Sequence, residues 1–126
     1  MPSPNIRLLI IDDEEDVLAV MKESAAHHGF TVSLASSVAA AIDLLNSGVV
    51  VDVVLCDVTM PDGGAERWLR DCWKLDPTLV SRTIVVSGWL APDAGSLVDG
   101  ITPENCLLKP FSMSDVRRTA TRMLGW

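Results

Sequence analysis

The chain has 126 residues, of which 48% are hydrophobic and 21% charged, and its formal net charge is −7 at pH 7. This length suits one domain, and the composition excludes a disordered or fibrous chain. The acidic balance argues against nonspecific binding to nucleic acid or to an anionic membrane, and no stretch has the roughly 20 apolar residues of a membrane span or the pattern of a signal peptide.

Short apolar runs alternate with longer amphipathic segments from the start of the chain to its end. The apolar runs are nearly continuous, as in parallel strands that are covered on both faces, and the longer segments have helical spacing. In chain order, the pattern predicts a strand at 6–11, a helix at 17–26, a strand at 31–35, a helix capped by Ser36 or Ser37 that stops at 46–48, a strand at 53–56, a helix at 65–75 ended by Asp76-Pro77, a strand at 83–86, a weak helix within 90–100, a strand at 106–108 and a helix over 112–124.

Five strand–helix units in succession imply right-handed crossovers and a parallel sheet between two layers of helices. The sequence contains no linker or internal repeat, so we expect one domain to fill residues 1–126. The cysteines Cys56, Cys72 and Cys106 have neither metal-site nor disulfide spacing, and we expect them to be buried free thiols of a cytoplasmic protein.

Charged and hydroxyl side chains follow four of the five expected strands. Asp12 and Asp13 come after the first strand, Asp57 after the third, Ser87 after the fourth and Lys109 after the fifth. In open α/β sheets the binding crevice lies beyond the carboxyl ends of the strands. We therefore expect these side chains to converge on one edge of the sheet.

This combination of side chains indicates a metal-assisted phosphoryl site. Neighbouring carboxylates raise one another's pKa unless a cation lies among them, and Lys109 alone supplies too little positive charge. Mg²⁺ prefers oxygen ligands and binds through one or two carboxylates together with water and phosphate oxygens. An aspartate can accept a phosphoryl group whose charge is neutralised by a metal, a lysine and a hydroxyl donor. The pattern therefore favours Asp57 as a metal-bound nucleophile.

Each motif has a simpler interpretation when it stands alone. Acidic residues at 12–16 suit the N-terminus of a helix, and Asp57 suits a turn that leads into Pro61. Ser87-Gly88 is a common turn, and Lys109-Pro110 has little meaning by itself. The joint arrangement at four strand ends is what favours a functional site.

With these motifs in this order, the chain resembles the receiver domain of two-component response regulators over essentially its whole length. The resemblance implies a doubly wound, flavodoxin-like (βα)5 fold with strand order 2-1-3-4-5. The soft, Pro/Gly-rich segment at 90–100 is most similar to receivers of hybrid histidine kinases. The residues that carry the resemblance are Asp12-Asp13, Asp57 ahead of Met60-Pro61-Asp62-Gly63, Ser87-Gly88 and Lys109-Pro110-Phe111.

The resemblance implies a signalling role in a two-component or phosphorelay system rather than an enzyme. Asp57 would accept the phosphoryl group of a histidine kinase or phosphotransfer protein and form a transient acyl phosphate. Lys109 would pair with the phosphoryl oxygens, and Ser87 would move to hydrogen-bond one of them, which would shift the following loop. Neither nucleic-acid binding nor membrane insertion is implied, and no residue pattern specifies an oligomeric state.

The resemblance also implies a set of magnesium ligands. Asp13 and Asp57 would hold Mg²⁺ directly, and Asp12 would act through water. The main-chain carbonyl of Thr59 would complete the ligands from the protein.

Two positions depart from the usual pattern of the family. The position three residues before the lysine is normally Tyr or Phe, and the small Cys106 stands there. Trp89 is either a substitute for this ring or a surface side chain beside the site. Thr59 and Trp89 occupy the two family positions that tune autodephosphorylation, and a bulky ring there obstructs the attacking water. We therefore predict a long-lived phosphoryl group.

Three other functions use a similar sheet. A phosphatase of the haloacid dehalogenase class also uses a strand-end Asp with Mg²⁺, but it needs a second Asp where Thr59 stands. A nucleotide or flavin binder needs a glycine-rich loop or P-loop after the first strand, where acids stand instead. A receiver-like interaction module that is never phosphorylated stays open, because Cys106 breaks the switch pattern.

Overall fold

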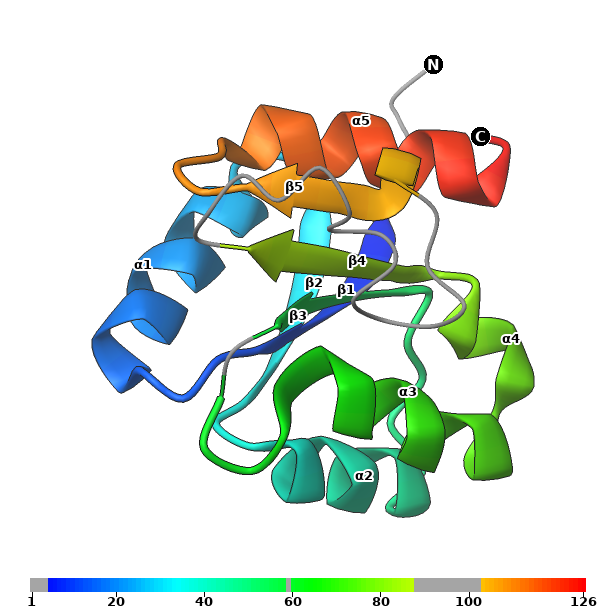
Figure 1. Cartoon of the computed structure of the whole chain (residues 1–126). Helices are drawn as coiled ribbons and strands as arrows, with labels where there is room; N and C mark the ends of the chain where they lie inside the picture. Colours follow the sequence, from blue (N-terminus) through cyan, green and yellow to red (C-terminus); the bar gives the residue numbers. More distant parts are fainter. Residues whose placement is uncertain (1–4, 59, 88–102) are drawn as a thin grey trace.

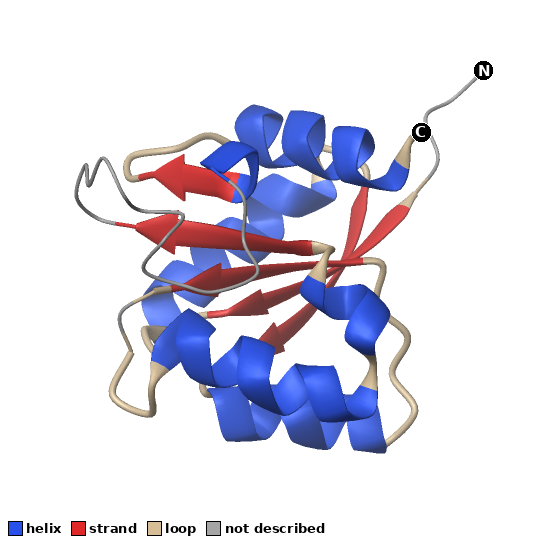
Figure 2. Ribbon diagram, turned by 45° about the vertical axis from the view of Figure 1, so that its right-hand side comes forward, coloured by secondary structure: helices blue, strands red, loops and turns tan. Residues whose placement is uncertain are grey.

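Five parallel strands form one sheet in the order β2-β1-β3-β4-β5 in the computed structural model, which describes residues 5–58, 60–87 and 103–126 (Figure 1). This order confirms the doubly wound fold, and the arrowheads in Figure 2 lie on one side of the sheet. The expected strands are all present; the second begins one residue earlier than expected, and the third and fourth each end one residue later. They are β1 (Ile6–Ile11), β2 (Phe30–Ala35), β3 (Val53–Asp57), β4 (Thr83–Ser87) and β5 (Cys106–Leu108).

Helices cover both faces of the sheet. One face carries α1 and α5 and the other carries α2 and α3 (Figure 1). The expected weak helix at 90–100 lies outside the described residues. None of the helices within the described ranges is long and apolar enough to span a bilayer. The helices are α1 (Glu15–Ala26), α2 (Val38–Asn46), α3 (Gly64–Leu75), α4 (Pro77–Val80), α5 (Met113–Leu124) and a short 3-10 helix, η1 (Pro103–Asn105).

The short helix α4 corrects the expectation that Asp76-Pro77 only ends a helix. Asp76 is also the N-cap of α4, and its Oδ1 accepts a hydrogen bond from the Thr78 amide at 3.1 Å. Pro77 occupies the first helical position, where its missing N–H is not needed. An N-cap Asp followed by Pro is itself a helix-start signal, so the same two residues end one helix and begin another.

Side-chain caps fix the starts of two other helices. Ser37, rather than Ser36, is the N-cap of α2, and its Oγ accepts from the Ala40 amide at 3.0 Å. Ser112 and Asp115 form a capping box at the start of α5. These caps satisfy amide groups that have no partner within the helix.

The core is divided by the sheet into two clusters of buried side chains. Successive side chains of a strand point to opposite faces. In β3, Val54 and Cys56 pack on the side of α2 and α3, whereas Val53 and Leu55 pack on the side of α1 and α5. Among the residues that the structure describes, Trp68 of α3 is the largest fully buried side chain, and its Nε1 donates to the Thr83 Oγ1 at 3.1 Å. Among the cysteines, Cys56 and Cys72 are buried free thiols, as expected, whereas Cys106 is half-buried.

An ion pair between the exposed Arg7 of β1 and the buried Asp52, which precedes β3, joins the two strands at the edge opposite the strand carboxyl ends. The Oδ2 of Asp52 accepts from the Arg7 amide at 2.9 Å and from its Nε at 3.0 Å, and the Oδ1 accepts from Nη2 at 2.9 Å. The hydrogen bonds from Arg7 hold the pKa of Asp52 below its ordinary value, although burial acts in the opposite direction.

Candidate functional site

The register of the sheet brings most of the predicted site residues to one edge. Ile11 pairs with Cys56 and Ser87 pairs with Leu108, so the residues that follow β1 and β5 lie at the level where β3 and β4 end. The Lys109 amide donates to the Ser87 carbonyl at 2.8 Å, which extends the pairing beyond β5. The side chains from four separate strands therefore approach one another because parallel strands end together.

Asp57 and Lys109 form an ion pair at this edge. The Lys109 Nζ donates to the Asp57 Oδ2 at 2.5 Å. Asp57 is 8% exposed, whereas the lysine side chain is 44% exposed. The hydrogen bond to Asp57 raises the pKa of Lys109, against the opposing effect of burial. The ammonium therefore stays charged at neutral pH, close to the carboxylate that the sequence indicates as a nucleophile.

Asp12 is the second buried carboxylate of the site. It is 6% exposed, and its Oδ1 accepts from the Glu14 amide at 2.9 Å. Burial raises the pKa of Asp12, and the negative charge of Asp57 raises it further, while the Glu14 amide and Lys109 lower it. The edge therefore holds two buried acids whose mutual repulsion one lysine only partly offsets.

This pair of acids suits a magnesium ion. Mg²⁺ binds proteins through one or two carboxylates and keeps several waters, so two buried acids beside a water-accessible edge match its needs. Within residues 5–58, 60–87 and 103–126, no three His, Cys, Asp or Glu side chains gather as metal ligands. Asp13 is exposed, and Thr59 lies outside the described residues. The roles of Asp12, Asp13, Asp57 and Thr59 as ligands all stay predictions.

Ser87 and Cys106 lie on neighbouring strands. Ser87 is the last residue of β4 and is 3% exposed. Cys106 pairs with Val85 of β4 and packs against the cluster on the side of α2 and α3. A small thiol therefore stands where the resemblance leads one to expect an aromatic ring, and Trp89 lies outside the described residues.

A cavity of about 650 Å³ opens beside the ion pair, between α1 and the segment that leads into α5. Asp12, Asp57 and Lys109 line its polar part, and apolar side chains such as Met21 and Phe111 line much of the rest. This cavity has no signal in the sequence, because it depends on how closely α1 packs against the distant α5 segment. A partner that reaches Asp57 from this side would meet an apolar surface.

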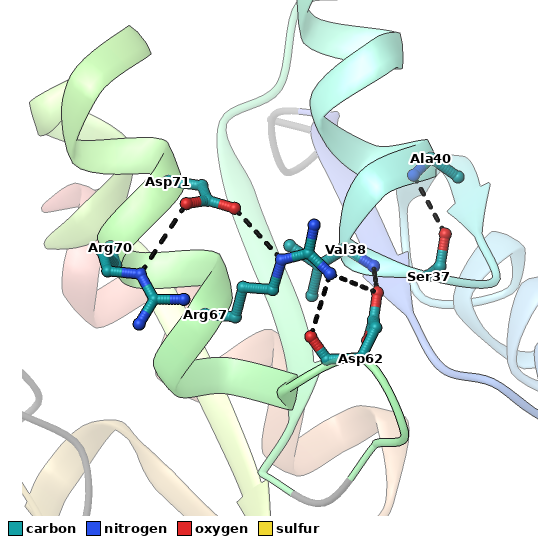
Figure 3. Close-up of polar contacts among 7 residues, drawn as sticks. All are labelled: Ser37, Val38, Ala40, Asp62, Arg67, Arg70 and Asp71. Carbon is teal, nitrogen blue, oxygen red and sulfur yellow. Dashed lines mark hydrogen bonds and ion pairs between the residues drawn. The ribbon is translucent and has the colours of Figure 1, made fainter.

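The turn after Asp57 is tied to both neighbouring helices through Asp62 (Figure 3). The Asp62 Oδ2 accepts from the Val38 amide at 2.7 Å. The Arg67 Nη1 donates to the Asp62 main-chain oxygen at 3.1 Å and lies 3.7 Å from its Oδ2. In the sequence, Asp62 is only part of a motif, and no spacing signal indicates that it contacts α2.

Comparison with known proteins identifies the family. Residues 8–121 match the family described as Response regulator receiver domain. The sensor kinase CckA of Brucella abortus (strain 2308) is 28% identical over 123 residues, which make up 97% of this chain and 13% of that protein.

Solved structures agree with this match. The response regulator receiver domain protein from Clostridium thermocellum has a TM-score of 0.82 and 25% identity, over 95% of this chain and 94% of that one. The response regulator receiver protein from Sinorhizobium medicae has a TM-score of 0.76 and 27% identity, over 96% of this chain and 95% of that one. The chain therefore belongs to the response regulator receiver domain family.

Proposed function

We propose that this receiver domain accepts a phosphoryl group on Asp57 from the phosphohistidine of a histidine kinase or phosphotransfer protein. The observation that carries the proposal is the contact of 2.5 Å between the Lys109 Nζ and the buried Asp57 Oδ2. This contact places a positive charge directly beside the carboxylate that would accept the phosphoryl group. The similarity to a sensor kinase supports a kinase as the donor.

The transfer is an in-line displacement at phosphorus. An oxygen of the Asp57 carboxylate forms the new bond to phosphorus while the bond from phosphorus to the donor's imidazole nitrogen breaks. The leaving imidazole carries a proton on its other ring nitrogen and keeps the electron pair of the broken bond, so it departs as the neutral donor histidine. The Lys109 ammonium, which pairs with the Asp57 carboxylate before the transfer, would pair with the phosphoryl oxygens after it.

Asp12, Asp13, Asp57 and the main-chain carbonyl of Thr59 would hold Mg²⁺. When it is bound, the ion supplies positive charge that offsets the negative charge of the phosphoryl oxygens. The two buried acids, Asp12 and Asp57, support this assignment because their charges need a cation beyond Lys109.

The phosphorylated state would be signalled through Ser87 and Lys109. The Ser87 hydroxyl would donate a hydrogen bond to a phosphoryl oxygen, and this movement would shift the segment that follows β4. Since Cys106 provides no ring to move with the hydroxyl, the response would involve Trp89 or a smaller rearrangement. We also propose that the acyl phosphate is long-lived, that the protein is cytoplasmic, and that residues 1–126 act as one signalling domain rather than as an enzyme.

The decisive experiment is intact mass spectrometry after incubation with phosphoramidate and Mg²⁺. We expect a single phosphoryl adduct on the wild type and none on Asp57→Asn. An unmodified wild type under conditions that phosphorylate a known receiver would instead favour an interaction module that is never phosphorylated, which is the function that the half-buried Cys106 keeps open. Continuous turnover of a phosphate ester would favour the aspartate-nucleophile phosphatase.

A further inference from the structure

The turn that joins Asp57 to α3 is anchored by hydrogen bonds at several points. The Val58 amide donates to the Val86 carbonyl of β4 at 2.9 Å, and the Gly63 amide donates to the Met60 carbonyl at 3.1 Å. The first bond fixes the start of the turn to the sheet, and the second closes the turn on itself. Asp62 supplies the connection from the turn to the helical layer.

Asp62 binds the N-terminus of α2. Its Oδ2 accepts from the Val38 amide, 24 positions away, at the short distance of 2.7 Å. Ser37, the N-cap of the same helix, takes the Ala40 amide instead, so the two acceptors satisfy different amides (Figure 3). A negative charge is favourable here because the N-terminus of a helix carries partial positive charge.

Arg67 holds Asp62 from the other side. It donates to the main-chain oxygen of Asp62 at 3.1 Å, and its Nη1 lies 3.7 Å from the Asp62 Oδ2. Its Nε also pairs with Asp71, one turn further along α3, at 3.3 Å (Figure 3). The side chain of Asp62 therefore connects α2 and α3 through the turn.

The second oxygen of the Asp62 carboxylate lies in an unfavourable environment. Among the described residues, the Asp62 Oδ1 is buried and has no hydrogen-bond partner. A buried acceptor without a partner is unfavourable, and such groups are often found where function requires a particular geometry. The contact of the Asp62 Oδ2 with the Val38 amide is therefore made although the other oxygen of the same carboxylate is buried without a partner among the described residues.

Gly64 packs closely against the backbone that follows the expected phosphoacceptor, Asp57. A Cβ on Gly64 would lie 2.1 Å from the Val58 carbonyl oxygen and 3.0 Å from the Asp57 carbonyl oxygen. The first residue of α3 is therefore packed directly on the peptide that follows Asp57. A displacement of the turn at Asp62 would therefore act on the backbone that directly follows Asp57.

We propose that Asp62 is a positioning residue, which holds Asp57 in the geometry for magnesium binding and phosphorylation by fastening the turn to α2. The proposal rests on the phosphoacceptor function of Asp57. The role of Asp62 is nevertheless distinct from that function, because Asp62 is not among the residues expected to hold the metal or the phosphoryl group.

The test compares Asp62→Ala, which removes the acceptor, with Asp62→Asn, which keeps an oxygen for the Val38 amide. Asp52→Asn is the matched control, since Asp52 is also a buried acid bonded to a backbone amide and an arginine, at the opposite edge of the sheet. Three quantities are measured for each protein. They are the melting temperature, the hydrogen exchange of the Val38 and Val58 amides without metal, and the Mg²⁺ concentration for half-maximal phosphorylation by phosphoramidate.

We expect Asp62→Ala to speed exchange at both amides and to raise the required Mg²⁺ concentration about 10-fold, at the low end of the effect of residues that orient metal ligands. Asp62→Asn should restore most of the wild-type behaviour. Asp52→Asn should lower the melting temperature without changing the Mg²⁺ requirement.

Two results would overturn the proposal. One is an unchanged Mg²⁺ requirement in a folded Asp62→Ala protein, and the other is an equal increase in Asp52→Asn, which would reduce the effect to general destabilisation. If the wild type itself is not phosphorylated, the phosphoacceptor function fails. Amide exchange in the metal-free proteins then still shows whether Asp62 fastens the turn.

Discussion

The Lys109 ammonium lies 2.5 Å from the Asp57 carboxylate, although the two residues are 52 positions apart in the chain. Asp57 ends β3, whereas Lys109 follows β5, and β4 lies between these strands in the sheet. The lysine side chain therefore extends across the end of β4, where Ser87 lies. A phosphoryl group on Asp57 would enter the space that this ion pair bridges.

Replacing Lys109 with methionine should slow phosphorylation more than it affects folding. The substitution removes the positive charge that would pair with the phosphoryl oxygens, and we expect transfer from phosphoramidate to be about 100-fold slower. The free energy of unfolding should change by about 1 kcal/mol or less, because the lysine side chain is 44% exposed. Mass spectrometry measures the rate of adduct formation, and urea denaturation measures the free energy of unfolding. Phosphorylation of the variant at the wild-type rate would contradict the role of Lys109.

Asp12→Asn should stabilise the metal-free protein. Burial and the charge of Asp57 place the pKa of Asp12 in the folded protein above its value in the unfolded chain, so ionisation of Asp12 opposes folding. This penalty is complete above the folded pKa and absent below the unfolded one. We therefore expect a gain of about 1 kcal/mol at pH 7 that disappears as the pH falls below about 4.

Thermal melts from pH 3 to 8 measure this gain, and the same melts with Mg²⁺ supply a control. The ion should stabilise the wild type more than Asp12→Asn, because the variant offers it less negative charge. A variant that is less stable than the wild type at pH 7 without metal would contradict the prediction.

Two tryptophans on α3 provide a matched test of burial. Trp68 is fully buried and donates to Thr83, whereas Trp73 on the same helix is 62% exposed. Trp68→Phe removes packed volume and leaves the Thr83 hydroxyl without its donor, and we expect a loss of about 1–3 kcal/mol. Trp73→Phe should change stability by about 0.5 kcal/mol or less. Chemical denaturation measures both, and equal losses would contradict the assigned burial.

Gly64→Ala should disturb the site more than a glycine substitution elsewhere. Gly64 has a φ of +59°, and its new methyl group would overlap the Val58 carbonyl oxygen. Gly48 has a φ of +97° with nothing within 4 Å of an added Cβ, so Gly48→Ala reports the backbone strain alone. That strain is about 1–2 kcal/mol.

We expect Gly64→Ala to lose more stability than Gly48→Ala and also to slow phosphorylation of Asp57. Denaturation curves and adduct formation on both variants make the comparison. Equal losses, with phosphorylation unaffected in each, would show that the contact with Val58 does not matter.

The strands and the meeting of Asp57 with Lys109 were predictable because both follow from local patterns. Buried parallel strands are continuous apolar runs, and the carboxyl ends of such strands share one edge. Helix α4 was missed although Asp76-Pro77 carried its start signal, because the same dipeptide also suits the end of α3. One motif then had two correct interpretations.

The rest of the site depends on contacts that have no sequence pattern. The bond from Asp62 to the Val38 amide joins a turn to a helix 24 positions earlier, and any carboxylate in a Pro/Gly-rich turn has the same appearance in the sequence. The cavity beside Asp57 depends in the same way on how α1 packs against the segment around Phe111. Such features follow from the packing of helices on the sheet and appear only in three dimensions.

Because the sheet divides the core, the side chains at two adjacent positions of one strand pack against different neighbours. Val54 and Leu55 are adjacent in β3, yet their side chains belong to clusters on opposite faces and have separate sets of neighbours. Substitutions at these two positions should therefore add in their effects, whereas substitutions of Val54 and Trp68, which share a cluster, should not. The layer of α1 and α5, which borders the cavity, can thus change in sequence without repacking the layer of α2 and α3 that holds the turn after Asp57.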